Sequence, residues 1–250
     1  MSAPLLVVGS YLSPYVRKVL VCLESKGLAY GIDPIVPFFG NDDFGRISPL
    51  RQVPVLVAGD LVLNDSTVIC QYLEERYPTP ALYPSDLGQR AQARWLEEFA
   101  DTRMGQVIIW QLFNQLVIRR AVWGKEPDQA LLERTYEQDL PAIFDYLEGL
   151  LPEQGWLFGA PSIAEISLAC FIRNAQLARY QLDAVRWPRL AACMANTLEL
   201  PAFARLAGFE AICMGTPIVQ QREALRLAGA PLSPQTFGRP EPMPGVMNRD

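Results

Sequence analysis

The sequence predicts an α/β domain followed by an all-helical domain, and three observations predict this order. Short apolar runs of the length typical of strands occur early in the chain, and none recurs beyond Asp86. A proline-rich stretch from Pro78 to Ser85, typical of a linker, follows these runs. After it, apolar residues recur every three or four positions, which favours helices. We therefore expect a first domain over residues 1–80, a linker over 81–86, a helical domain over 87–229, and a proline-rich tail without its own core over 230–250.

The first 80 residues predict a four-stranded mixed sheet. Leu5–Val8 is a short apolar strand, and 30–35 is a second one, parallel to the first if the helix between them makes the usual crossover. Two further apolar runs flank Ala58-Gly59-Asp60 and predict an antiparallel hairpin. The other expected elements are a helix over 15–26 that ends at Gly27, an irregular segment with exposed aromatic residues over 37–44, and a helix from 65 to about 77.

The part of the chain beyond the linker predicts helices only. Ser162-x-x-Glu165 has the spacing of a capping box, in which each residue bonds to the backbone N–H of the other, so we assign this motif to folding. The expected helices cover 90–123, 132–150, a segment beginning at 161, 188–197, 201–210 and 217–229.

Composition and charge exclude several classes of function. Half of the residues are hydrophobic and a fifth are charged, as in ordinary globular proteins. The net charge of −5 argues against nucleic acid as the main partner, because phosphate binding requires a clustered basic surface. The start, Met1-Ser2-Ala3-Pro4, lacks the basic region of a signal peptide, and no run approaches the ~20 apolar residues that span a bilayer. We expect a soluble cytoplasmic protein without a membrane partner.

Cysteine and histidine usage limits the available chemistry. The five cysteines lie in apolar or helical stretches and show neither a Cys-x-x-Cys nor a metal-ligand spacing, so we expect buried free thiols, a reducing compartment and no metal site. The chain contains no histidine, which removes Ser-His-Asp and Cys-His catalysis. Any acid–base chemistry must use Tyr, Ser, a carboxylate, Lys or the substrate itself.

The turn after the first strand is a candidate site for an anion. Ser13-Pro14 is a helix-start signal, because the serine oxygen caps free N–H groups and proline fits the first helical position. Those N–H groups and the positive end of the helix dipole would also stabilise a thiolate beside Ser13, and the thiolate is the reactive form of a thiol. Taken alone, the motif favours a capped helix without chemistry.

Two further motifs lie at the ends of expected strands. Gln52-Val53-Pro54 precedes a strand; if the Val53–Pro54 bond is cis, the Val53 backbone groups are left to receive a peptide as an added strand. The alternative is a plain strand-initiating proline. Asp65-Ser66 begins a helix and could hold an amino-acid head, with Asp65 on the ammonium and Ser66 on the carboxylate. Simple N-capping is the alternative there.

A thiol, a peptide bond and an amino-acid head are the parts of glutathione, and with this match the sequence resembles a cytosolic glutathione transferase over roughly residues 4–215. Such proteins have a thioredoxin-like domain followed by an all-helical bundle. Ser13-Pro14-Tyr15-Val16 is similar to the serine turn of plant and bacterial members, and stands where glutaredoxins carry Cys-Pro-Tyr-Cys. Gln52-Val53-Pro54 resembles the family's cis-proline loop, Asp65-Ser66 its acid–serine pair, and Ser162-x-x-Glu165 its helix-opening box.

The resemblance implies roles for individual residues. Ser13 is the expected donor to the glutathione sulfur, and Tyr11 is a rival because other branches of the family use tyrosine. Arg17 and Lys18 are expected to be surface or interdomain charges. Plant relatives meet the glycine carboxylate of glutathione with a lysine in the 38–44 segment; this chain has no basic residue there, and Arg51 is a possible substitute. The residues expected to line the electrophile pocket are Leu12, Phe39, Trp110, Phe113, Leu116 and Val117.

The implied activity is the conjugation of glutathione, as co-substrate, to a hydrophobic electrophile, a reaction associated with detoxification. Glutathione-dependent peroxidase, reductase or isomerase activity on the same fold is the alternative, and a non-catalytic binding or regulatory role is a third. Thiol–disulfide exchange through position 13 is disfavoured, because a serine cannot form a mixed disulfide. The resemblance further implies a homodimer. The tail over 230–250 could cover the cleft, reach a partner subunit or be disordered.

Overall fold

The chain packs into two units, and the first of them combines both ends of the sequence. A computed structural model describes residues 4–243. One unit contains the chain up to Pro80 together with the chain from Arg205 onward, and the other is Ala81–Ala204. The C-terminal helices beyond Arg205 therefore pack with the sheet, whereas the sequence places everything up to residue 229 in the helical domain. The expectations for Met1–Ala3 and for residues 244–250 of the tail concern parts of the chain outside the described residues.

The first unit is built on a four-stranded mixed sheet, as predicted. The strand order is β2-β1-β3-β4, with β1 parallel to β2 and antiparallel to β3, and β3 antiparallel to β4. The register places Asp33, Val8, Val55 and Asn64 in one row across the strands. The strands are β1 (Leu5–Val8), β2 (Tyr30–Asp33), β3 (Val55–Ala58) and β4 (Leu61–Asn64).

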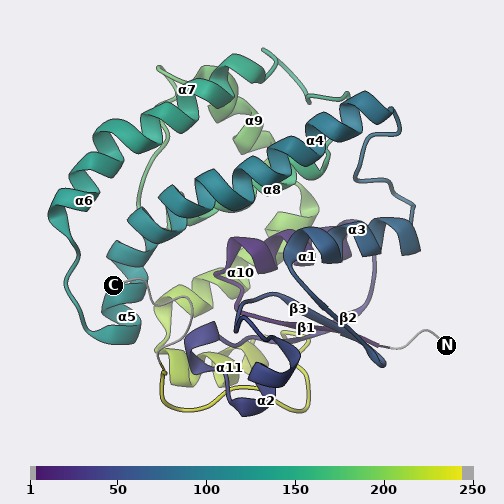
Figure 1. Ribbon diagram of the computed structural model, residues 1–250, viewed down its shortest axis with the longest axis vertical. Coiled ribbons are helices and arrows are strands. Elements are labelled where there is room, and N and C mark those ends of the chain that lie inside the picture. The colour runs from purple at the N-terminus through teal and green to yellow at the C-terminus, as the bar shows by residue number, and fades with distance from the viewer. Residues whose placement is uncertain (1–3, 244–250) are drawn as a thin grey trace. The chain divides into compact units, whose positions relative to one another are not determined.

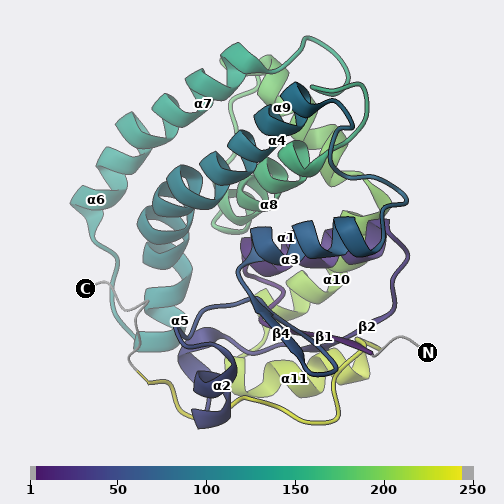
Figure 2. The ribbon, with the colours of Figure 1, turned by 45° about the vertical axis from the view of Figure 1, so that its right-hand side comes forward.

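Helices cover both faces of this sheet. Helices α1 (Pro14–Ser25) and α3 (Ser66–Arg76) lie side by side on one face, and α11 (Ile218–Leu227) lies on the other (Figures 1 and 2). The apolar residues of α1 recur with helical spacing and are fully buried, which fixes its orientation on the sheet. Most of α10 (Pro201–Gly215) also belongs to this unit.

The segment after β2 is more ordered than the sequence predicts. It forms a short 3₁₀ helix, η1 (Pro37–Phe39), followed by α2 (Asp42–Ile47). The prediction of exposed aromatic residues was wrong, because Phe38, Phe39 and Phe44 are at most 8% exposed. A Cβ on Gly40 would lie only 2.8 Å from Cγ of Phe44, so the close approach of this ring requires a glycine.

The expectation that Arg17 and Lys18 are surface charges was also wrong. Both side chains are buried, because their positions on α1 face α10 and α3 and not solvent. The Arg17 guanidinium forms an ion pair with Glu210 on α10, and Lys18 Nζ donates to Thr67 Oγ1 on α3 at 3.0 Å. Buried charges of this kind are retained only where partners compensate them.

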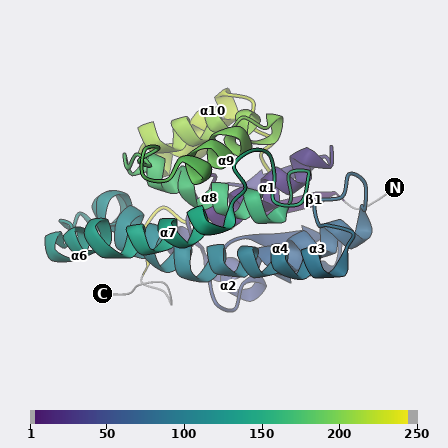
Figure 3. The same cartoon turned by 90° about the horizontal axis from the view of Figure 1, so that it is seen from above.

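The second unit is helical throughout the described elements. The predicted long helix is present as a continuous run whose middle part, η2, has π-type hydrogen bonding; we have no physical account of the length of that part. Helix α8 packs along α4 and η2 (Figure 3) and begins with the predicted capping box of Ser162 and Glu165. The elements are α4 (Leu87–Phe99), η2 (Ala100–Ile118), α5 (Arg119–Trp123), α6 (Gln129–Arg134), η3 (Thr135–Asp139), α7 (Leu140–Leu150), α8 (Ile163–Leu177) and α9 (Pro188–Leu198).

The structure describes the surroundings of the cysteines and the length and character of the helices, on which two expectations from composition depend. Cys22, Cys70, Cys170, Cys193 and Cys213 are free and buried, which confirms the prediction made from their apolar surroundings. Within residues 4–243, no helix combines the length and the apolar character that a bilayer crossing demands.

Candidate functional site

The three motifs singled out in the sequence leave the sheet at the same edge. The Ser13 turn follows Val8, the Val53-Pro54 segment precedes Val55, and Asp65 follows Asn64. Val8, Val55 and Asn64 are consecutive partners in the strand register. Because neighbouring strands lie about 4.8 Å apart, one edge of the sheet presents the three segments side by side. The sheet topology therefore brings together the residues that the sequence predicts to share a ligand.

Ser13 is the N-cap of α1. Its backbone is extended, and its Oγ accepts a long hydrogen bond of 3.4 Å from the Val16 N–H. The turn itself is closed by the Ser13 N–H, which donates to the Ser10 carbonyl at 3.1 Å. The side chain is half-buried, so it is held by the fold while part of it faces solvent. A hydroxyl with a weak internal bond at a helix N-terminus can donate its proton to an anion.

Tyr11, the rival donor, has a different environment. Its side chain is 1% exposed, and its ring lies 5.0 Å from that of Phe209 on α10. Among residues 4–243 its hydroxyl has no hydrogen-bond partner. Burial, with the nearby Cys213 and Glu24 as smaller causes, raises the pKa of Tyr11. This burial distinguishes Tyr11 from the half-buried Ser13, and the choice between the two donors stays a prediction.

The Val53–Pro54 peptide bond is cis. Within the described part of the chain, the N–H and C=O groups of Val53 take no part in a backbone hydrogen bond. The preceding residue is fixed, because the Gln52 N–H donates to Ser48 Oγ at 3.0 Å and its C=O accepts from the same hydroxyl at 2.8 Å. A Cβ on Gly9 would lie 3.0 Å from Cβ of Val53, so a glycine allows the Ser13 turn to approach this segment closely.

Asp65 and Ser66 begin α3. Asp65 Oδ1 accepts from the N–H groups of Thr67 and Val68 at 2.8 and 3.1 Å, so the carboxylate caps the helix. The side chain is nonetheless exposed, and its backbone has a φ of 77°, which is unusual for a residue other than glycine. Such an outlier persists only where the surroundings enforce it, and outliers cluster at ligand sites. Ser66 is 2% exposed, which places its hydroxyl inside the fold.

Arg51 stands directly before the Val53-Pro54 segment and also has a positive φ, of 51°. Its guanidinium donates to the carbonyl oxygens of Gly40 and Asn41 and lies over the Phe44 ring, 5.6 Å from its centroid. The guanidinium therefore braces the segment after β2, and its role toward a glycine carboxylate stays a prediction.

The sequence did not indicate that Asp33 belongs to this edge of the sheet. Asp33 is fully buried at the end of β2, and its C=O accepts from the Gly9 N–H at 2.9 Å. Burial raises the pKa of its carboxyl, although hydrogen bonds from Phe237, Thr236 and Arg222 oppose that shift. The signal in the sequence was the aspartate at the end of an apolar strand. A carboxylate that is buried in such a position is retained only where other groups pair with it.

The residues expected to line an electrophile pocket are divided between the two units. Leu12 is half-buried beside Ser13, and Phe39 is 8% exposed. The other four lie on η2 of the helical unit. There, Phe113 is 4% exposed, whereas Trp110, Leu116 and Val117 are half-buried. Their common role stays a prediction.

These features define the class of protein: a thioredoxin-like sheet domain that carries the candidate site, joined to a helical domain. A family model described as "Glutathione S-transferase, N-terminal domain" matches residues 7–81, and one described as "Glutathione S-transferase, C-terminal domain" matches residues 121–194. The chain belongs to the glutathione S-transferase superfamily. The serine-type assignment within it stays a prediction.

Individual relatives agree with this assignment and support an enzyme. The chain is 30% identical to glutathione S-transferase Z1 of Arabidopsis thaliana over 207 residues, covering 75% of this chain and 84% of the relative. It is 33% identical to a maleylpyruvate isomerase of Ralstonia over 201 residues, covering 76% and 91%. The crystal structure of a glutathione S-transferase from Rhodospirillum rubrum F11 matches with a TM-score of 0.74 and 28% identity, covering 81% and 91%. Within residues 4–243, no group of three or more metal-ligating side chains occurs.

Proposed function

We propose that this chain is a glutathione transferase in which Ser13 stabilises the thiolate of glutathione for attack on a hydrophobic electrophile. The observation that carries the proposal is the position of Ser13: a half-buried hydroxyl, weakly bonded within the protein, at the N-terminus of α1. Family membership supports it. In the reaction a carbon–sulfur bond forms, the leaving group departs with its electron pair, and no side chain of the enzyme is modified.

The expected stabilisation is sufficient without a general base. A free thiol with a pKa of ~8.5 is only a few per cent ionised at neutral pH. A hydroxyl donor and a helix N-terminus, each contributing about 1–2 kcal/mol, together lower that pKa by roughly 1.5 to 3 units. The thiolate then becomes a major species at pH 7. This fits a chain that has no histidine.

The remaining motifs are proposed to hold the rest of glutathione. The free backbone groups of Val53 are suited to pair with a peptide, with Pro54 fixing the turn and Gln52 beside it. Asp65 and Ser66 at the start of α3 are proposed to receive the γ-glutamyl head. The residues proposed to contact the electrophile are Leu12 and Phe39 of the first unit and, on η2, Trp110, Phe113, Leu116 and Val117.

A second candidate is a glutathione-dependent isomerase, and the similarity to the Ralstonia maleylpyruvate isomerase favours it. Such an enzyme would use the same Ser13-stabilised thiolate and release it unchanged. Stoichiometry separates the two functions, because conjugation consumes free thiol and isomerisation does not. The assay compares loss of free thiol with an aryl halide against isomer conversion with a cis-configured unsaturated keto acid.

Replacing Ser13 with alanine tests the proposal directly. The pKa of bound glutathione, titrated by the ultraviolet absorbance of its thiolate, is expected to rise by roughly one unit or more, with a corresponding loss of kcat/KM at neutral pH. Ser85→Ala removes an exposed hydroxyl in the linker and serves as the matched control. Tyr11→Phe is expected to leave the thiol pKa unchanged. If the pKa moves in Tyr11→Phe and not in Ser13→Ala, the assignment of the donor is wrong.

Two finer expectations belong to the same proposal. A cytoplasmic location follows from the family resemblance and from the cysteine usage. Homodimer formation is proposed to use four of the large apolar side chains left exposed on the helical unit, Trp95, Tyr136, Tyr146 and Leu150. Sedimentation of the purified chain tests it.

A further inference from the structure

The segment over residues 231–243, here called the strap, is docked along the first unit. It pairs with β2 as a short parallel bridge between Ile32 and Leu232, and then follows the segment after β2. The backbone bonds are Ile32 N–H to Pro231 C=O (2.8 Å), Ser233 N–H to Ile32 C=O (2.9 Å), Asn41 N–H to Phe237 C=O (2.7 Å), Arg239 N–H to Phe39 C=O (2.8 Å) and Met243 N–H to Phe38 C=O (2.8 Å). The sequence left three alternatives for the tail: it could cover the cleft, reach a partner subunit or be disordered. For residues 231–243, the last alternative is wrong.

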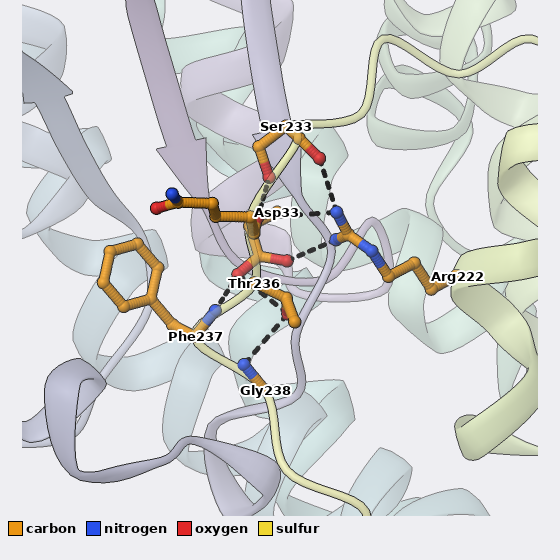
Figure 4. Close-up of polar contacts among 7 residues, drawn as sticks. Asp33, Arg222, Ser233, Thr236, Phe237 and Gly238 are labelled. Atoms are coloured by element: carbon orange, nitrogen blue, oxygen red, sulfur yellow. Dashed lines mark hydrogen bonds and ion pairs between the residues drawn. The ribbon is translucent and has the colours of Figure 1, made fainter.

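The buried carboxylate of Asp33 joins the strap to the sheet (Figure 4). It accepts from the Phe237 N–H at 2.6 Å and from Thr236 Oγ1 at 3.2 Å on the strap, and from Arg222 Nη1 at 2.6 Å on α11. The same guanidinium donates through Nη2 to the Ser233 carbonyl. Figure 4 shows that Arg222 contacts the carboxylate from one side and that the strap contacts it from the other side.

Polar contacts, and not apolar burial, hold the strap in place. Among its described residues only Ser233 is buried, and most of the others are exposed. A cavity of about 290 Å³ remains between the end of β2, the start of α11 and the strap. Segments with few buried apolar contacts open at low free-energy cost, so the strap depends on its polar contacts, which are the five backbone bonds and the Asp33 cluster.

A series of contacts connects the strap to the residue that precedes the Gln52-Val53-Pro54 segment. It bonds to Asn41 and Phe39, and the carbonyls of Gly40 and Asn41 in turn accept from Arg51, whose guanidinium also meets Met243 Sδ. Arg51 holds a left-handed backbone directly before the expected peptide-binding residues. A left-handed arginine persists where its surroundings enforce it, and here those surroundings include the strap.

We propose that the strap is a positioning element of the glutathione site, and that Asp33 and Arg222 are positioning residues which hold it against residues 38–41, where the carbonyl groups of Gly40 and Asn41 accept from Arg51. This inference rests on the proposed glutathione binding. It makes the affinity for glutathione depend on the chain's own C-terminal segment. The thiol pKa, which depends on Ser13, is independent of the strap.

The test replaces Arg222 with methionine, which removes its bonds to Asp33 and Ser233 while keeping a long side chain. Arg226→Met is the matched control, because Arg226 lies one turn further along α11 and, within residues 4–243, bonds to the exposed Glu223 and not to the strap. Phe237→Pro removes the strap N–H that Asp33 accepts and attacks the same cluster from the other side. Glutathione affinity by calorimetry, thiol pKa and amide exchange are measured on each full-length protein.

In Arg222→Met and Phe237→Pro we expect glutathione to bind about 2- to 30-fold more weakly, the range typical of positions that couple to a site without touching the ligand. Amide exchange should accelerate in residues 32–41, while the thiol pKa and the control variant stay unchanged. If exchange accelerates and affinity does not change, the strap is merely structural and the inference is overturned. If the wild-type chain binds no glutathione, the proposed function itself fails, which is a different result.

Discussion

The buried ion pair between Arg17 and Glu210 gives the most quantitative prediction for the sheet unit. Both side chains are at most 3% exposed, and Arg17 Nη2 also donates to the Tyr11 carbonyl at 3.3 Å. Removing one partner leaves an uncompensated charge in the interior, which costs about 3–5 kcal/mol. Replacing both by apolar residues of similar volume removes that charge. We therefore expect the free energy of unfolding to fall by about 3–5 kcal/mol in Arg17→Met and in Glu210→Met. In the double variant we expect it to fall by less than in either single variant.

The free energy of unfolding is measured by urea denaturation followed by far-ultraviolet circular dichroism. The chain supplies its own control, because Glu24 and Arg205 form a second ion pair between the same two helices. In this pair the arginine side chain is 54% exposed, so Arg205→Met is expected to change the free energy of unfolding by about 0–1 kcal/mol. If the losses in the two Arg17 and Glu210 single variants simply add in the double variant, the charge argument is wrong and packing alone explains their effect.

Two further predictions concern the helical unit and the cysteines. Ser162 Oγ accepts from the Ala164 N–H at 3.2 Å and donates to Glu165 at 2.7 Å, so Ser162→Ala should lower the stability of the chain by about 1–2 kcal/mol, measured in the same denaturation assay. Burial raises the pKa of Cys193 and of Cys213 to about 12, which leaves about one thiol in 10⁴ ionised at pH 8. A chromogenic disulfide reagent should therefore react with neither thiol in the native protein and with all five after denaturation; rapid reaction of a native thiol would contradict the burial described here.

Local patterns were sufficient for most of the sheet unit. The strands, the hairpin and the capped helices follow from apolar runs and from turn residues within a few positions of each other. The helix α2 was missed, although its signal was present: Asn41 caps it by accepting from the Phe44 N–H at 2.9 Å, and two aspartates follow in its first turn. The burial of Phe38 and Phe39 was not predictable in this way, because the strap bonds to their carbonyl groups from a distant part of the chain.

The motifs of the candidate site were predictable from the sequence, whereas the buried charged residues of this unit were not. Ser13, Val53 and Asp65 were recognised because each stands at a strand or helix end, and the register then places them at one edge. The buried charges were not recognised, because a single arginine or aspartate in an apolar stretch normally indicates a surface position. Asp33 and Arg222 are 189 positions apart, and Arg17 and Glu210 are 193 apart, so no local pattern connects them.

Both of these pairs join the first 33 residues to the chain beyond Arg205, which lies outside the regions that match the two family models. The residues that would touch glutathione therefore lie within the recognisable family domain, whereas Glu210 and Arg222, the partners of Arg17 and Asp33, lie outside it. A sequence change between 205 and 243 can then alter the site while every motif residue remains the same. For this chain, an activity inferred from Ser13, Val53 and Asp65 must therefore also take account of Glu210 and Arg222, the C-terminal partners of Arg17 and Asp33.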